Sequence, residues 1–162
     1  MSKKIFIILP YKESISHKSA GAVSLYVKDL TNNSKYKKNI KIISSKENKI
    51  KFFRNRNYIL DFCTKYKETK IDIIEIHNRP EYVLYIKKYF PNTKIILIFH
   101  NDPLSIKSSK TEEEREYLIN NTSKLIFIST WVQKRFYFNL KNVDITNSAI
   151  ISHGIKKKII LI

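Results

Sequence analysis

Short apolar runs alternate with amphipathic stretches along most of the chain. The runs are four to seven residues long and rich in β-branched residues, which is typical of strands buried on both faces. They cover Lys3–Leu9, Ile40–Ser44, Ile71–Ile76, Lys94–Phe99, Lys124–Ser129 and Ala149–Ser152. We therefore predict about six strands.

Between these runs, apolar residues recur at the three- and four-residue spacing of an α-helix. One helix is predicted to follow Gly21 and end at Asn32–Asn33, and another to open at Pro80 and stop before Pro91. Two further helix starts have capping-box spacing, at Thr111 with Glu114 and at Thr130 with Gln133. The stripes expected to face the core are Val23, Tyr26, Val27 and Leu30, then Tyr58, Ile59, Phe62, Cys63 and Tyr66, then Val132, Phe136 and Leu140.

The alternation of strands and helices predicts an α/β fold, a Rossmann-like domain with a parallel sheet of about six strands flanked by helices. In such sheets the functional groups lie just beyond the carboxyl ends of the strands. The polar segments at these positions are Pro10–Gly21, His77–Glu81, His100–Asp102, Ser129–Thr130 and His153–Gly154. We expect His77, His100 and Ser129 to lie exposed at one rim of the sheet.

Composition limits the setting of this domain. The 162 residues suit one domain, and the single cysteine, Cys63, rules out an internal disulfide. We expect Cys63 to be a buried structural thiol and the protein to be cytoplasmic. The sequence has no apolar stretch of membrane-spanning length and no signal-peptide pattern.

The formal net charge is +17, and its excess is concentrated in the first half of the chain. Such a charge favours anionic partners, among them nucleic acid, acidic lipid and phosphorylated substrates. Lys, Ile and Asn all have A/T-rich codons, so genome composition accounts for part of the lysine excess.

The segment His77-Asn78-Arg79-Pro80-Glu81 is the densest polar cluster. Its imidazole, amide, guanidinium and carboxylate suit a hydroxyl-rich or phosphorylated ligand, although a capped turn with an Arg–Glu surface pair would have the same composition. His100 follows an apolar strand and could donate a hydrogen bond to a reacting group, or could simply cap a neighbouring loop.

Gly21 precedes a predicted helix, where the absence of a side chain lets a phosphate approach the helix amino terminus; a simple turn is the alternative. No metal site is predicted, because His77 and His100 lie far apart and neither a CxxC nor an HExxH motif is present. No cofactor is expected.

Six segments, in this order, resemble the N-terminal domain of family-4 retaining glycosyltransferases, which have the glycosyltransferase-B fold. They are Leu9-Pro10, Ser19-Ala20-Gly21-Ala22, Ile74 to Glu81, Ile98-Phe99-His100-Asn101, Ile126 to Ser129, and Ile150 to Ile155. The resemblance spans about residues 3–155, and its His-Asn-Arg-Pro-Glu segment is similar to enzymes of lipopolysaccharide and surface-glycan synthesis. Two positions depart from the family pattern, since His153 replaces an Asn and Ala20 replaces a Gly.

The resemblance implies a role for each matching residue. His100 would be the catalytic residue, reaching the donor sugar in an interdomain cleft. Gly21 would border the donor diphosphate, and His153 with Gly154 would form the hinge. The remaining substrate-binding residues would be His77, Asn78, Arg79, Glu81 and Ser129.

By the same resemblance, residues 1–155 would be the acceptor-side domain and 156–162 a truncated linker or tail. The donor-binding C-terminal domain would be absent, through truncation, a disrupted frame or encoding on a separate chain. The expected function is therefore that of one half of an enzyme that moves a sugar from a nucleotide-sugar to a glycan or lipid-linked acceptor with retention. That half is expected to be inactive alone.

Two other partners follow from the charge. A basic nucleic-acid-binding α/β module is the alternative function, since Lys46–Arg56 interleaves basic residues with Phe52 and Phe53; we disfavour it because no recognised nucleic-acid motif is present. The segment Lys35–Arg56 carries nine basic residues against Glu47 and could hold the domain peripherally on the inner face of an anionic membrane.

Overall fold

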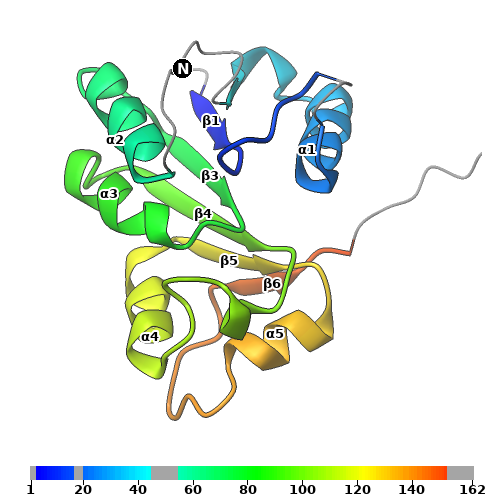
Figure 1. Ribbon diagram of the computed structural model, residues 1–162, viewed down its shortest axis with the longest axis vertical. Helices are drawn as coiled ribbons and strands as arrows, with labels where there is room; N and C mark the ends of the chain where they lie inside the picture. Colours follow the sequence, from blue (N-terminus) through cyan, green and yellow to red (C-terminus); the bar gives the residue numbers. More distant parts are fainter. Residues whose placement is uncertain (1–2, 17–19, 45–54, 153–162) are drawn as a thin grey trace, which may run out of the picture.

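A computed structural model describes residues 3–16, 20–44 and 55–152 of the chain. Six parallel strands form one sheet in the order β2-β1-β3-β4-β5-β6, flanked by helices (Figure 1). The strands are β1 (Ile5–Ile8), β2 (Ile40–Ile43), β3 (Ile73–His77), β4 (Lys94–Phe99), β5 (Lys124–Phe127) and β6 (Ser148–Ile150). The predicted Rossmann-like α/β class and its parallel sheet are confirmed.

Five α-helices and two 3₁₀ turns connect the strands in the described residues. The α-helices are α1 (Ala22–Asn33), α2 (Asn55–Tyr66), α3 (Glu81–Tyr89), α4 (Glu112–Asn121) and α5 (Thr130–Phe136), and the turns are η2 (Lys37–Asn39) and η3 (Pro103–Ser105). The helices predicted after Gly21 and Pro80 are therefore present, and they end where the paired Asn residues and Pro91 indicate.

Near β1 the sheet is buried on both faces. Successive strand residues point to opposite sides, so each face buries alternate residues of the strand. Ile7 and Leu9 pack with Val23 and Val27 of α1 on one face. The larger core lies on the other face, where side chains of α2 to α5 meet alternate strand residues such as Phe6. This two-sided burial explains why the β1 run is almost wholly apolar.

The apolar side chains predicted to face the core from the helices do so, except at the ends of two of these helices. Tyr58 to Tyr66 contribute five buried side chains from α2. Leu30 of α1 is 37% exposed, and Leu140 lies beyond the end of α5 at Phe136. The edge strand β6 pairs only with β5, so Ile150 and Ile151 remain 41% and 47% exposed.

Cys63 is fully buried in α2, and burial raises the pKa of its thiol to about 12. The predicted structural thiol is confirmed. Within the described ranges, no helix combines the length and the apolar character needed to cross a bilayer.

One predicted helix cap is confirmed and the other is wrong by one residue. Thr111 and Glu114 form a capping box at the start of α4. At α5, Ser129 is the N-cap in place of Thr130, since its hydroxyl accepts from the Val132 backbone N–H at 3.2 Å. Ser129 still has the extended backbone of the preceding strand (φ −158°, ψ 161°), so the helix can begin only after it.

Ser129→Ala should therefore lower the free energy of unfolding by about 1 kcal/mol, because it leaves a helix N–H without its side-chain acceptor. Thr130→Ala removes a hydroxyl one position later and is expected to change stability by less than about 0.5 kcal/mol. Urea denaturation of the two variants side by side checks the assignment. Equal losses of stability, or a larger loss for Thr130→Ala, would contradict the assignment of Ser129 as the N-cap and favour Thr130.

Candidate functional site

The candidate site lies where the order of the strands reverses. The chain runs from β1 outward to β2 and then returns to β3 on the other side of β1, with α1 and α2 on opposite faces. Such a switch point leaves a crevice at the carboxyl ends of the strands, where open α/β sheets bind their ligands. A cavity of about 400 Å³ lies here, lined by Pro10, Glu13, Ala22, Val23, Asn78, Arg79, His100 and Asn101.

Two histidines form a buried pair beside this cavity. His77 Nδ1 lies 2.8 Å from His100 Nε2, with the ring centroids 5.1 Å and the ring planes 26° apart, so the two rings meet edge to edge. The other nitrogen of His77, Nε2, lies 2.7 Å from Glu75 Oε1. The two residues that lie far apart in the sequence are thus in direct contact, because His77 ends β3 and His100 directly follows the neighbouring parallel strand β4.

Both histidines are buried, which corrects the expectation that they lie exposed at the rim. His77 is 0% and His100 8% exposed. Tyr26 of α1 covers them, with its ring edge-on 6.1 Å from His77 and 5.3 Å from His100. Burial, followed by the charge of Glu75, raises the pKa of Tyr26, so its phenol stays neutral.

Asn78 ties the ends of β3 and β4 together. Its Oδ1 accepts from the backbone N–H of His100 at 2.8 Å and of Asn101 at 3.3 Å. Its own N–H donates to Ile98 O, and its φ of 51° lies in the left-handed region that asparagine tolerates better than most residues. Asn78 therefore holds His100 in register with His77.

Arg79 and Glu81 leave this cluster in different directions. Arg79 lines the cavity, and its Nη1 donates to Asn78 O at 2.9 Å. Glu81 starts α3 and lines a separate groove of about 470 Å³ between α3 and α4. An Arg79–Glu81 ion pair, which the sequence left open as the alternative, is not among the ion pairs of the described residues.

Gly21 is the N-cap of α1 and has no side chain to cap the helix. Glu13 does so from the preceding loop, since its Oε2 accepts from the Ser24 N–H at 2.8 Å. A Cβ atom on residue 21 would lie 2.7 Å from Glu13 Cδ and 2.8 Å from Oε2. The close approach at Gly21 is thus made by a carboxylate of the chain itself, placed where the helix dipole favours an anion.

Gly21→Ala is expected to push the Glu13 carboxylate off the helix and lower the free energy of unfolding by about 1 kcal/mol. Glu13→Ala should have a similar effect, because it removes the same cap. If the two act on one contact, the double variant is about as stable as either single variant. Denaturation of all three checks this, and strictly additive losses would contradict it.

The other sequence-predicted residues lie apart from the cavity or outside the description. Ser129 shares the rim of strand ends but caps α5 and does not line the cavity. Asp102 caps η3 and makes a two-oxygen contact with the Arg135 guanidinium, which holds the pKa of Asp102 below its usual range. The hinge residues His153 and Gly154 lie outside the described residues, as do Ser19 and the segment 45–54 with Phe52 and Phe53.

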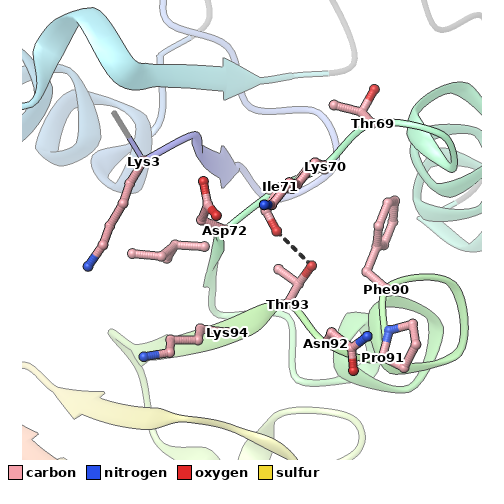
Figure 2. A pocket seen from close by; sticks show the side chains of 11 residues that line it. Lys3, Thr69, Lys70, Ile71, Asp72, Phe90, Pro91, Asn92, Thr93 and Lys94 are labelled. Carbon is pink, nitrogen blue, oxygen red and sulfur yellow. Dashed lines mark hydrogen bonds between the residues drawn. The ribbon is translucent and has the colours of Figure 1, made fainter. Parts of the chain in front are cut away.

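A second cavity, of about 440 Å³, lies at the opposite, amino-terminal ends of β1, β3 and β4 (Figure 2). Its inner polar groups are used within the fold. Thr93 Oγ1 donates to Ile71 O at 2.9 Å, and Asp72 Oδ2 accepts from the Lys4 N–H at 2.7 Å. Lys3 and Lys94 are exposed beside it. These contacts indicate a structural role for this end of the sheet.

Among the described residues, no group of three or more His, Cys, Asp or Glu side chains is arranged to hold a metal ion. The cavity instead offers amide, guanidinium, imidazole and carboxylate groups. Together they can both donate hydrogen bonds to a polar ligand and accept them from it.

Sequence reasoning assigned no site role to Glu13, Tyr26 or Glu75, and it included Asn101 only as part of the polar segment His100–Asp102. A signal for Glu75 was present, because it is an acidic residue within the apolar strand run Ile71–Ile76, and a buried carboxylate needs a partner. Glu13 and Tyr26 carry no such signal, since their roles depend on how α1 lies against the sheet.

No protein-family model matches this chain, and no curated protein matches it significantly.

Proposed function

We propose that this chain is the N-terminal, acceptor-side domain of a retaining glycosyltransferase that transfers a sugar from a nucleotide-sugar to a glycan or lipid-linked acceptor. The observation that carries the proposal is the cavity at the strand-order reversal, where Asn78, Arg79 and His100 come together beside the start of α1. The resemblance of the His77–Glu81 and Ile98–Asn101 segments to this family assigns the same residues to the substrate cleft.

The chemistry of the cavity suits a sugar carrying a phosphate. The Arg79 guanidinium can pair with phosphate oxygens, and imidazole and amide groups recognise hydroxyls. His100 would contact the donor sugar, while Glu81 and Ser129, which lie away from the cavity, would act on the acceptor side. Catalysis would consist of positioning and of stabilising an oxocarbenium-like transition state and the leaving diphosphate.

Nucleotide recognition belongs in this proposal to a second domain, and the chain alone is expected to show no turnover. The binding half of the proposal is tested by titrating the ¹⁵N-labelled protein with UDP-, GDP- and dTDP-sugars at millimolar concentration. Amide shifts should change at Gly21, Asn78 and His100 and stay constant at Thr69 and Asn92 around the second cavity. His100→Ala should weaken binding about tenfold, because it removes one hydrogen bond between uncharged groups.

Two results would contradict the proposal. Shift changes confined to the second cavity, or none with any nucleotide-sugar, would remove the sugar-binding role. Transfer or hydrolysis of a nucleotide-sugar by the chain alone would contradict the proposal that two domains are needed for turnover.

A lipid-linked acceptor would place the domain at an anionic membrane surface, and we include this docking in the proposal. Lys35, Lys37, Lys38 and Lys41 are exposed around η2 and β2, although the Lys41 ammonium also lies over the rings of Phe6 and Tyr66. Each lysine near an anionic surface contributes about 1 kcal/mol, so four are enough for reversible binding.

Vesicle co-sedimentation tests the docking. The protein should bind phosphatidylglycerol vesicles, be released by salt, and ignore phosphatidylcholine vesicles. Replacing the four lysines by Gln should abolish binding, whereas the same change at Lys88, Lys107, Lys110 and Lys134 should leave most of it. Equal binding to both lipids, or equal loss in both variants, would refute docking through this surface.

A further inference from the structure

The single tryptophan of the chain, Trp131, lies exposed at the carboxyl edge of the sheet. It follows Ser129, the N-cap of α5, by two residues and is 56% exposed. The inward side of the same helix is filled by Val132 and Phe136, which are buried. Core packing therefore does not require an indole at position 131, where a polar residue would change stability little.

An arginine holds the indole ring in place. Arg135 lies one helical turn after Trp131, and its guanidinium carbon is 5.9 Å from the centroid of the indole and also 5.9 Å from that of the Phe138 ring. Asp102 fixes the guanidinium in turn, since Arg135 Nε and Nη2 donate to its carboxylate oxygens at 3.1 and 3.0 Å. The indole is thus a flat surface that a ligand does not have to order on binding.

The contact with Asp102 also shows which way Trp131 faces. Asp102 is the N-cap of η3 and directly follows Asn101, which lines the cavity at the strand-order reversal. Because residues four apart share one side of a helix, Trp131 lies on the side of α5 that faces the end of β4. Helical side chains lean towards the amino terminus of their helix, which here is the carboxyl edge of the sheet. The indole therefore lies on the same edge as the cavity, one strand further along.

The groups beside the indole suit a ligand that carries hydroxyls. The side chains of Arg135 and Asp102 are 36% and 26% exposed, and they offer donor N–H groups and acceptor oxygens next to the ring. Because the charge of Arg135 is balanced by that of Asp102, this pair does not by itself favour a phosphate. A pyranose has the matching chemistry, with an apolar C–H face that packs on an aromatic ring and hydroxyls around its edge.

We propose that Trp131 is a stacking platform for one sugar unit of the acceptor, with Arg135 and Asp102 as the residues that position its ring. That the sugar belongs to the acceptor rests on the proposed function, in which the glycan extends from the cavity along this edge of the sheet. The platform itself rests on the exposed and fixed indole.

Intrinsic fluorescence of the full chain tests the platform directly, because Trp131 is its only tryptophan. The indole is excited at wavelengths that tyrosine does not absorb, while methyl glycosides of glucose, galactose, mannose and N-acetylglucosamine are added at millimolar concentrations. Stacking removes the indole from water, so its emission should shift to the blue and saturate with at least one glycoside. Glycerol at the same hydroxyl concentration has no ring and should leave the emission unchanged.

Variants separate stacking from mere apolar contact, with binding followed through the amide shift of Leu104 in η3. Trp131→Phe keeps a flat ring and should weaken glycoside binding about threefold, whereas Trp131→Leu lacks the ring and should weaken it about tenfold. Arg135→Gln releases the indole and should weaken binding about threefold. Tyr36→Leu is the matched control, since Tyr36 is a similarly exposed aromatic residue beside η2 and its loss should leave binding unchanged.

An unchanged emission with all four glycosides, an equal response to glycerol, or equal binding by Trp131→Phe and Trp131→Leu would overturn the proposal. A blue shift on raising the protein concentration alone would assign the indole to a contact between copies of the chain instead. The glycosides carry no nucleotide, so the two proposals can fail separately. Nucleotide-sugar binding at Asn78 without a glycoside response at Trp131 would reject only the platform, and the reverse result would reject only the donor cleft.

Discussion

Arg115→Met is expected to lower the free energy of unfolding by about 3 kcal/mol, because it removes two hydrogen bonds to a charged group and each such bond contributes about 1.5–3 kcal/mol. Arg115 is 2% exposed and is the largest fully buried side chain of the described residues. Its Nη1 donates to Lys110 O at 2.8 Å, and its Nη2 donates to Phe138 O at 2.8 Å. One guanidinium thus joins the loop before α4 to the residues after α5.

Arg135→Met is the control for this prediction, as it is the same change on the neighbouring helix α5. Arg135 forms a partly exposed ion pair with Asp102, and such pairs contribute about 0–1 kcal/mol. Arg115→Lys keeps the charge of Arg115, but a single ammonium cannot reach both carbonyls, so it should lose nearly as much as Arg115→Met. Guanidinium chloride denaturation separates the three. Equal losses for Arg115→Met and Arg135→Met would show that the carbonyl contacts contribute little.

The strand pattern predicted most of the fold because the sheet is buried on two faces around β1 and β4. The runs around Ile5–Ile8 and Lys94–Phe99 are apolar for that reason, and the structure has strands there. The order of the strands was not predictable, since no residue in β1 indicates which two strands lie beside it. The cap of α5 was misplaced because Ser129 and Thr130 are both good caps, and only backbone geometry distinguishes them.

The rim of polar residues was predictable from topology alone, but its internal contacts were not. Parallel strands place His77 and His100 at the same edge. The hydrogen bond between them, the packing of Tyr26 over them and the contact with Glu75 depend on the directions of the side chains. The two-residue alternation along a strand determines only the face of the sheet on which each side chain lies. Burial of the two histidines was missed because α1, placed only as a helix by the sequence, closes over them.

Asn78 is the residue on which this arrangement of the rim depends most. Its backbone is left-handed, and its side chain accepts from two backbone N–H groups of the segment that carries His100. These are two separate demands. A left-handed φ costs an ordinary residue about 1–2 kcal/mol, and a buried N–H without an acceptor costs about 1–3 kcal/mol.

Three substitutions at Asn78 should separate these demands in urea denaturation. Asn78→Ala removes the acceptor oxygen and puts an unsuited residue in the left-handed region, so it is expected to lower the free energy of unfolding by about 3 kcal/mol. Asn78→Gly removes the acceptor but accepts the left-handed backbone, so it should lower the free energy of unfolding by about 2 kcal/mol. Asn78→Asp keeps an acceptor oxygen and tolerates the left-handed region, so it should lose least, about 1 kcal/mol. The gap between Ala and Gly measures the backbone, and the gap between Gly and Asp measures the acceptor. If Gly were as stable as Asp, the Oδ1 contacts would not hold the β4 end, and His100 would owe its position to His77 and Tyr26 instead.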